Sequence, residues 1–220
     1  MESDASEWAK SKRHSSSPRR DPVKMLECAL QSVATLFGNG CCATGFIFQN
    51  WRRYYMLGPG HGGPQLGNAT AKFRKGFSLT ITCRGYTFIP DLAVFDMYID
   101  ETVPELVSSE LGTASRLKPG DRCRIIGSPR GQKIETIAGT IVQVPKHLVN
   151  YHAGNIEYIE ISADVQAGFS GSPVFDEKNA EVVGMVVRGR PGLTLATPID
   201  EIRSELPRYI DNLNHLQHKC

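Results

Sequence analysis

The feature that most constrains the fold of this chain is a long series of short apolar runs, without alternating long helices. Glycine, proline and asparagine separate these runs, and the 220 residues include 21 Gly and 13 Pro. Turn-forming residues at such short intervals favour many short strands, and the series of runs is typical of an all-β sandwich or barrel. We expect strands at Val33–Phe37, Gly45–Phe48, Tyr54–Leu57, Ser78–Cys83, Leu92–Met97, Arg122–Ile126, Ile134–Val144, Glu157–Ile161, Pro173–Phe175, Val182–Val187 and Leu193–Ala196.

Helical patterns occur at the two ends of this β region. Asp21 and Pro22 supply an N-cap and a first helical residue, and the apolar spacing that follows predicts a short helix from about residue 22 to residue 31. Near the other end, apolar residues recur every three or four positions from Ile199 to Leu216, which predicts an amphipathic helix. Pro207 should kink or split this helix.

The composition is that of an ordinary globular protein. Hydrophobic residues make up 40% of the chain and charged residues 22%, which excludes a mostly disordered chain, a collagen and a coiled coil. No apolar run approaches the roughly 18 residues that a membrane span needs. The net charge of +2 argues against nucleic acid as the main partner, because phosphate binding needs a strong basic excess.

The first 20 residues have a different character, because they are polar and include the basic stretch KSKRHSSSPRR. We expect residues 1–20 to be a disordered, solvated tail, although a nuclear address or a phosphorylation site is an alternative. The chain begins without the apolar core of a signal peptide, and its six cysteines show no secreted framework. We therefore expect an intracellular protein, cytoplasmic or nuclear, with reduced thiols.

The clearest chemical motif places Ser170 between Gly168 and Gly171, just before an apolar strand. A serine hydroxyl is a weak nucleophile, so it needs a nearby base and an exposed position on a tight turn, which glycines permit. The amides of Gly168 and Ser170 could then face the oxygen that becomes negative during acyl transfer. Taken alone, the motif is equally consistent with a glycine-rich turn that merely contains serine.

Two further residues complete a recognisable constellation. His61 lies just past an apolar strand, and Asp91 lies at the start of another. The order His, Asp, Ser is one of the known chain orders of a Ser-His-Asp triad. Asp91 is preferred over Asp96 because it stands at the entrance of the strand. Each residue taken singly would more often be a solvated loop histidine or a turn-forming aspartate.

With these motifs in place, the chain resembles the trypsin-like (chymotrypsin-fold) serine peptidases, most closely the Deg/HtrA branch, over roughly residues 22–206. The resemblance covers residues 32–35, 43–47, 54–61, 90–95, 117–121, 127–131, 167–174, 181–186 and 196–200. It implies an all-β fold of two six-stranded antiparallel β-barrels, with a short N-terminal helix, a C-terminal helix and an active site between the barrels.

The resemblance also divides the chain. After the tail of residues 1–20, residues 21–105 would form the barrel that carries His61 and Asp91, and residues 106–206 the barrel that carries Ser170. Residues 207–220 would form the C-terminal helix and a tail. Because the sequence ends near the C-terminal helix, we expect no PDZ domain of the kind common in Deg-type proteases.

The function implied by the resemblance is that of a serine endopeptidase that cleaves polypeptides through an acyl-enzyme. His61 would be the general base, Asp91 would orient it, and the amides of Gly168 and Ser170 would form the oxyanion hole. No metal or organic cofactor is implied. A zinc site at His215, His218 and Cys220 would lack a fourth ligand nearby.

One departure from the family pattern motivates a second hypothesis. The family usually has two small residues such as Ala before its histidine, whereas here Gly58, Pro59 and Gly60 precede His61. The alternative is therefore a catalytically inactive trypsin-fold binding module. The sequence leaves the substrate, the oligomeric state and release from a larger precursor open.

The resemblance also places a pocket for the residue before the cut. Asp164, six residues before Ser170, falls at its base, and Val187, Arg188 and Gly189 fall along its wall. A buried carboxylate at Asp164 would attract Lys or Arg in the substrate. The alternatives are that Asp164 turns outward or pairs with Arg188 or Arg190, and that the pocket prefers small aliphatic residues, as in Deg-type relatives.

Overall fold

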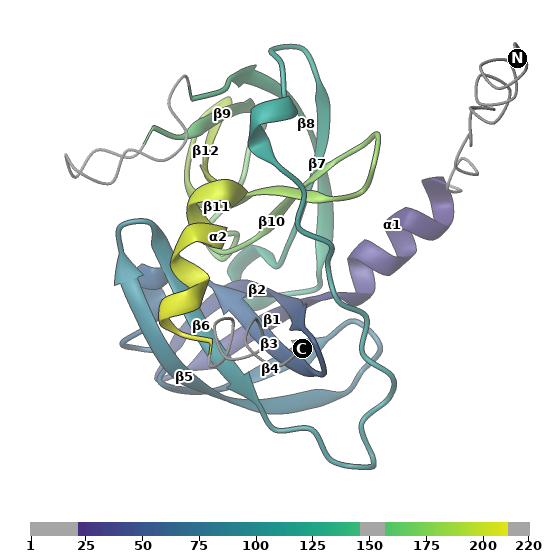
Figure 1. Cartoon of the computed structure of the whole chain (residues 1–220), viewed down its shortest axis with the longest axis vertical. Coiled ribbons are helices and arrows are strands. Elements are labelled where there is room, and N and C mark those ends of the chain that lie inside the picture. The colour runs from purple at the N-terminus through teal and green to yellow at the C-terminus, as the bar shows by residue number, and fades with distance from the viewer. Residues whose placement is uncertain (1–21, 146–156, 211–220) are drawn as a thin grey trace, which may run out of the picture.

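The apolar runs form strands that pair into two closed antiparallel barrels (Figure 1). The computed structural model describes residues 22–145 and 157–210. Strands follow the order β1-β2-β3-β6-β5-β4 in the first barrel and β10-β11-β12-β9-β8-β7 in the second. The prediction of an all-β fold with two six-stranded barrels is confirmed.

The strands of each barrel are consecutive in the chain. The first barrel consists of β1 (Val33–Gly38), β2 (Cys41–Asn50), β3 (Arg53–Gly58), β4 (Asn68–Phe73), β5 (Ser78–Phe88) and β6 (Asp91–Met97). The second consists of β7 (Arg122–Gly127), β8 (Glu135–Gln143), β9 (Ile159–Ser162), β10 (Pro173–Asp176), β11 (Val182–Arg190) and β12 (Leu193–Pro198). The division at residue 105 lies between β6 and β7, and the exact boundary stays a prediction.

β4 is a strand that the apolar runs did not predict. Its side chains alternate between exposed and buried positions, and the buried ones are Ala69, Ala71 and Phe73. Alanine has a low strand propensity, so the sequence lacks the run of branched and aromatic residues that marks the other strands. β4 pairs with both β1 and β5 and so closes the first barrel.

Both expected helices are present, with one difference in position. α1 spans Pro22–Gln31, as predicted, and α2 spans Ile199–Glu205. α2 therefore begins inside the range expected for the second barrel rather than after it. Pro207 lies in a 3₁₀ turn that directly follows α2, consistent with its expected effect on the helix. The expected tails, and the rest of the amphipathic pattern, lie outside the described residues.

Apolar side chains form three clusters, one inside each barrel and one in the seam between the barrels. The seam cluster contains Leu57 and Leu92 from the first barrel, Ile126 and Met185 from the second, and Ile202 from α2. β6 shows how the sequence builds both kinds of cluster. Because successive strand residues face opposite sides, this strand divides its apolar side chains between the barrel interior and the seam.

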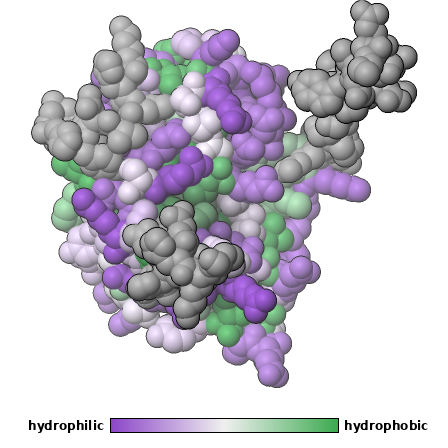
Figure 2. All heavy atoms as spheres, viewed as in Figure 1, coloured by the Kyte–Doolittle hydropathy of each residue, from purple (hydrophilic) through white to green (hydrophobic). Residues whose placement is uncertain are grey.

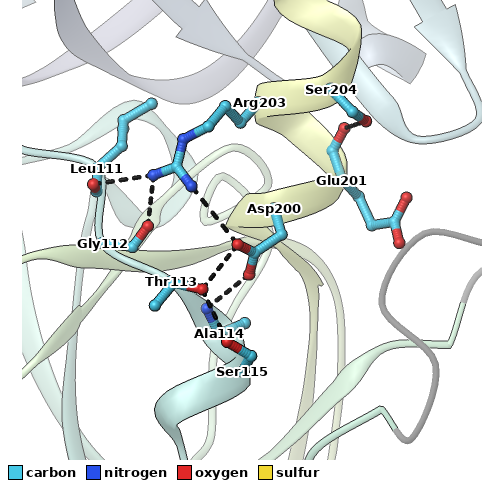
Figure 3. Close-up of polar contacts among 9 residues, drawn as sticks. All are labelled: Leu111, Gly112, Thr113, Ala114, Ser115, Asp200, Glu201, Arg203 and Ser204. Carbon is cyan, nitrogen blue, oxygen red and sulfur yellow. Dashed lines mark hydrogen bonds and ion pairs between the residues drawn. The ribbon is translucent and has the colours of Figure 1, made fainter.

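α2 is fixed to the segment that joins the barrels (Figure 3). Asp200 accepts hydrogen bonds from the Thr113 hydroxyl and the Ala114 amide, both at 2.7 Å. Arg203 donates to the carbonyl oxygens of Leu111 and Gly112 at 2.9 and 2.5 Å. The helix thereby ties the end of the chain back to the inter-barrel segment.

The surface is mainly hydrophilic on the face drawn in Figure 2, where apolar side chains show only in separate areas. None of the helices in the two described ranges is long and apolar enough to cross a membrane.

Candidate active site

His61 lies on a single turn of 3₁₀ helix, Gly60–Gly62, just after the end of β3. Gly60 is required by a close approach, because a Cβ at this position would collide with the backbone of Thr87 and Leu92. Thr87 lies on β5, and Leu92 follows Asp91 on β6. The glycine before His61 therefore lets the turn press against the β5–β6 hairpin.

Asp91, the first residue of β6, is only 5% exposed and holds His61 at two points. One carboxylate oxygen accepts the backbone amide of His61 at 2.6 Å, and the other lies 2.7 Å from ring atom Nδ1. An ionised carboxylate can only accept hydrogen bonds, so the neutral ring carries its proton on Nδ1. Atom Nε2 is then free to accept a proton from another group.

The contact with Asp91 raises the pKa of His61 above its ordinary value of 6.5. The hydrogen bond to Asp91 is the largest cause, and the negative charge of Asp91 adds to it. Partial burial of the ring and the positive charge of Arg188 act in the opposite direction. The site thus presents a half-exposed imidazole that is more basic than usual.

Ser170 lies in the loop between β9 and β10, and the glycines on either side shape this loop. Gly168 and Gly171 have φ angles of +97° and +85°, a region that residues with a Cβ rarely adopt. A Cβ at Gly168 would also collide with the backbone of Ser128 and Arg130. The loop can therefore turn sharply at Ser170 only with glycine at both positions.

Two backbone amides of this loop are without an acceptor among the described residues. Within the described chain, the backbone N–H groups of Gly168 and Ser170 donate no hydrogen bond, whereas those of Phe169 and Gly171 donate to carbonyls at 3.2 and 2.8 Å. A pair of free donors beside a serine hydroxyl suits an oxygen that gains negative charge.

The loops that carry His61 and Ser170 lie against each other across the seam. A Cβ at Gly171 would approach the Cδ atom of Pro59 to 2.5 Å, and Pro59 precedes His61 by two residues. The structure therefore places the three residues expected to form a triad at one site, with His61 and Asp91 from the first barrel and Ser170 from the second.

The Ser170 hydroxyl itself is turned toward β11. It donates to the Val187 carbonyl at 3.4 Å, and no hydrogen bond joins it to His61 in the described ranges. This distance is at the long limit of a hydrogen bond, so the contact with Val187 is weak.

Thr44 on β2 contributes to the site although no role was predicted for it from the sequence. Its amide donates to the Ser170 carbonyl at 2.9 Å, and its hydroxyl donates to the Gly168 carbonyl at 2.8 Å. The same hydroxyl accepts the Ser128 amide at 2.9 Å. This fully buried residue of the first barrel thus holds two loops of the second. Only its place in the motif of residues 43–47 marked it in the sequence.

The structure differs from the expected pocket at Asp164, the residue expected at the base of the pocket. Asp164 is exposed rather than buried, and its carboxylate accepts the Gly192 amide at 2.5 Å. β9 ends at Ser162, so Asp164 follows the strand and turns toward solvent. The expectation of a buried carboxylate is therefore wrong. In the described chain Asp164 forms no ion pair with Arg188 or Arg190.

The other expected pocket residues surround the Ser170 loop. Val187 is partly buried and contacts Ser170 through its carbonyl. Gly189 is exposed, and a Cβ there would approach the side chain of Val165 to 2.5 Å. Val165, rather than Asp164, is thus the residue of this segment that faces β11.

No cluster of three or more His, Cys, Asp or Glu side chains that could hold a metal ion occurs in the part of the chain that the structure describes. His215, His218 and Cys220 lie outside this part.

Comparison with known proteins places these features in a family. A family model described as a trypsin-like peptidase domain matches residues 44–185, a range that contains His61, Asp91 and Ser170.

Two sequence relatives are named as proteases. The chain is 30% identical over 102 residues to protease Do-like 14 of Arabidopsis thaliana, which is 44% of this chain and 24% of that protein. It is 35% identical over 68 residues to the pro-apoptotic serine protease NMA111 of Lodderomyces elongisporus, which is 29% of this chain and 7% of that protein. The chain therefore spans a quarter or less of these curated relatives.

Solved structures show the same fold. Two structures of the HtrA-type protease AlgW with a tripeptide, one of them a substituted form, superpose on this chain with TM-scores of 0.73 and 0.69 at 21% identity. The matches cover 87% and 86% of this chain and 64% of each neighbour. The chain belongs to the trypsin-like peptidase domain family.

Proposed function

We propose that this chain is a serine endopeptidase that cleaves polypeptides through an acyl-enzyme. Ser170 is the nucleophile, His61 the general base and Asp91 the residue that orients His61. The observation that carries this proposal is the double contact of buried Asp91 with the amide and ring of His61, across the seam from a serine flanked by two free amides.

In the first step, Ser170 Oγ attacks the carbonyl carbon of the peptide bond while His61 Nε2 takes the hydroxyl proton. The amides of Gly168 and Ser170 stabilise the oxyanion. The C–N bond then breaks, and His61 gives its proton to the leaving amine. Water attacks the ester in the same way, which releases the acid and restores Ser170.

A second candidate function is a trypsin-fold binding module without activity. The observation that favours it is the Ser170 hydroxyl, which contacts Val187 and not His61 in the described chain. The two functions predict different reactivity of the same hydroxyl, because only a serine with a working base reacts rapidly with an electrophilic phosphorus.

The test combines a fluorophosphonate probe with a peptide library. We expect the wild-type chain to be labelled at Ser170 and to cleave a subset of the library. The variants Ser170→Ala and His61→Ala should lose labelling and cleavage while they keep the wild-type melting temperature. Labelling that persists in His61→Ala, together with an uncleaved library, would favour the binding module.

A further inference from the structure

Two arginines on one strand carry uncompensated positive charge beside Ser170. Arg188 directly follows Val187, whose carbonyl accepts the Ser170 hydroxyl, and Arg190 lies two residues further along β11. Both residues are exposed. In the described ranges, neither forms an ion pair with a carboxylate.

The backbone of a third arginine contacts the loop that carries Ser170. Arg130 is exposed, and its amide donates at 2.7 Å to the carbonyl of Ala167, the residue before Gly168. The two acidic side chains expected at this site are already engaged, because Asp91 binds His61 and Asp164 binds the Gly192 amide. Among the described residues, no carboxylate forms an ion pair with any of these three arginines.

The strand that carries Arg188 has an open edge at this point. β11 pairs with β12 as far as Arg190, but its pairing with β10 extends only to Met185. Residues 188–190 therefore have a described strand neighbour on one side only. An extended peptide can pair with such an edge, and its side chains then lie beside those of the strand.

We propose that Arg188 is a specificity-determining residue that selects substrates with an Asp or Glu side chain close to the scissile bond, on the acyl side; this inference rests on the proposed function. A substrate carboxylate there gains a charge-assisted hydrogen bond to a guanidinium that forms no ion pair within residues 22–145 and 157–210, and a substrate Lys or Arg is repelled. This preference is the reverse of the one expected from a buried Asp164.

The electrostatics of the site agree with this placement. Arg188 lowers the pKa of His61, against the stronger effect of Asp91. The guanidinium is therefore close enough to the reacting groups to act on a charge held near them.

The experiment starts from a peptide that the library shows to be cleaved. Each of the three residues on the acyl side of the cut is replaced in turn by Glu, Gln and Lys, and kcat/KM is measured for wild type, Arg188→Gln, Arg188→Glu and Arg188→Lys. The matched control is Arg52→Gln. Arg52 is also exposed, but it lies in the turn just before β3, roughly 20 Å of extended chain away from Gly58.

At one position or more, we expect wild type to prefer Glu over Gln by about fivefold, the free energy of an exposed ion pair of about 1 kcal/mol. The preference should disappear in Arg188→Gln, reverse in Arg188→Glu, persist in Arg188→Lys and Arg52→Gln, and weaken as salt is raised. Equal rates for Glu and Gln at all three positions in wild type, or an unchanged preference in Arg188→Gln, would overturn the proposal.

Failure of the proposed function is distinguishable from failure of this inference. If no peptide is cleaved, the same Glu, Gln and Lys peptides are labelled and their binding to wild type and Arg188→Gln is measured by fluorescence anisotropy. A Glu preference that depends on Arg188 then supports a charge-selective binding site. Binding that is indifferent to charge refutes the role of Arg188 in either case.

Discussion

At the scale of single residues, the chemistry of the site depends on how Asp91 holds His61. Two hydrogen bonds fix both the backbone and the ring of His61, so one aspartate sets the position and the tautomer of the proposed base. We expect Asp91→Asn to reduce kcat on the order of 10⁴-fold, the loss found for the same change in another triad protease. Steady-state kinetics with a cleaved library peptide provides the measurement.

Asp96 offers a matched control on the same strand. Its carboxylate pairs with Arg84 at 2.9 Å and is 46% exposed, so it has no contact with His61. Asp96→Asn should therefore keep nearly wild-type kcat. If Asp96→Asn is the harmful change and Asp91→Asn is silent, the assignment of the third triad member is wrong.

The raised pKa of His61 predicts the acidic limit of activity. A protonated His61 cannot accept the serine proton, so kcat/KM should fall as the pH drops through the pKa of the free enzyme. The midpoint of this fall should lie above 6.5, because Asp91 raises the pKa from that value. Asp91→Asn removes both raising effects, and its residual activity should fall at lower pH.

The pH profile also tests the influence of Arg188. Its charge lowers the pKa of His61, so Arg188→Gln should move the acidic limit to higher pH than in wild type. Profiles of kcat/KM from about pH 5 to about pH 9 give both midpoints. A wild-type midpoint at or below 6.5 would contradict the raised pKa.

At the scale of elements, β2 of the first barrel holds the reactive loop of the second through Thr44. Thr44→Val keeps the shape of the side chain but removes two hydrogen bonds of its hydroxyl. We expect the free energy of unfolding to fall by about 1–3 kcal/mol, because buried polar partners are left unpaired. We also expect kcat to fall roughly tenfold or more, because small displacements of reacting groups are costly.

The control for Thr44 is a buried hydroxyl far from the chemistry. The Ser32 hydroxyl donates to the Ala29 carbonyl at 2.8 Å and contacts Ser109. Ser32→Ala should lower the unfolding free energy by a similar amount while kcat is kept, and Thr44→Ser should keep both quantities near wild type. A normal kcat in Thr44→Val would show that Thr44 only stabilises the fold.

The same elements show what the sequence could and could not predict. Runs of branched and aromatic residues predicted most strands, because burial on a pleated surface selects these side chains. β4 was not predicted, because its buried residues Ala69 and Ala71 are small and do not form such a run. The position of Asp164 was not predictable, since one residue more or less after a strand reverses the direction of a side chain. The role of Thr44 was not predicted, because its hydrogen-bond partners are more than 80 residues away in the sequence.

At the scale of the whole molecule, the proposed activity requires that the two barrels keep a fixed relative position, since each contributes part of the candidate site. The seam cluster contains side chains from both barrels and from α2. α2 is in turn bound to residues 111–114, the segment that connects the barrels. α2 therefore helps to hold the two barrels, and with them the two parts of the site, in place.

Removal of this contact should destabilise the molecule without changing its chemistry. Asp200→Ala removes the acceptor of the Thr113 hydroxyl and of the amide of Ala114, a fully buried residue, whereas Arg203 keeps its hydrogen bonds to the carbonyls of Leu111 and Gly112. We expect the free energy of unfolding to fall by about 2–3 kcal/mol. The melting temperature should drop by about 2–4 °C for each kcal/mol in a chain of this size. Urea denaturation followed by circular dichroism gives the free energy.

Two variants make this test specific. Asp200→Asn keeps a carbonyl oxygen that can accept the Ala114 amide, so it should lose less stability than Asp200→Ala. Asp100→Ala removes another aspartate that accepts a backbone amide, that of Thr102 at 2.8 Å, but in an exposed turn. Because surface changes usually cost within about 0.5 kcal/mol, its unfolding curve should nearly match wild type. If Asp200→Ala unfolds like Asp100→Ala, α2 does not hold the barrels together. If it remains stable but loses kcat at low temperature, α2 instead acts on the site itself.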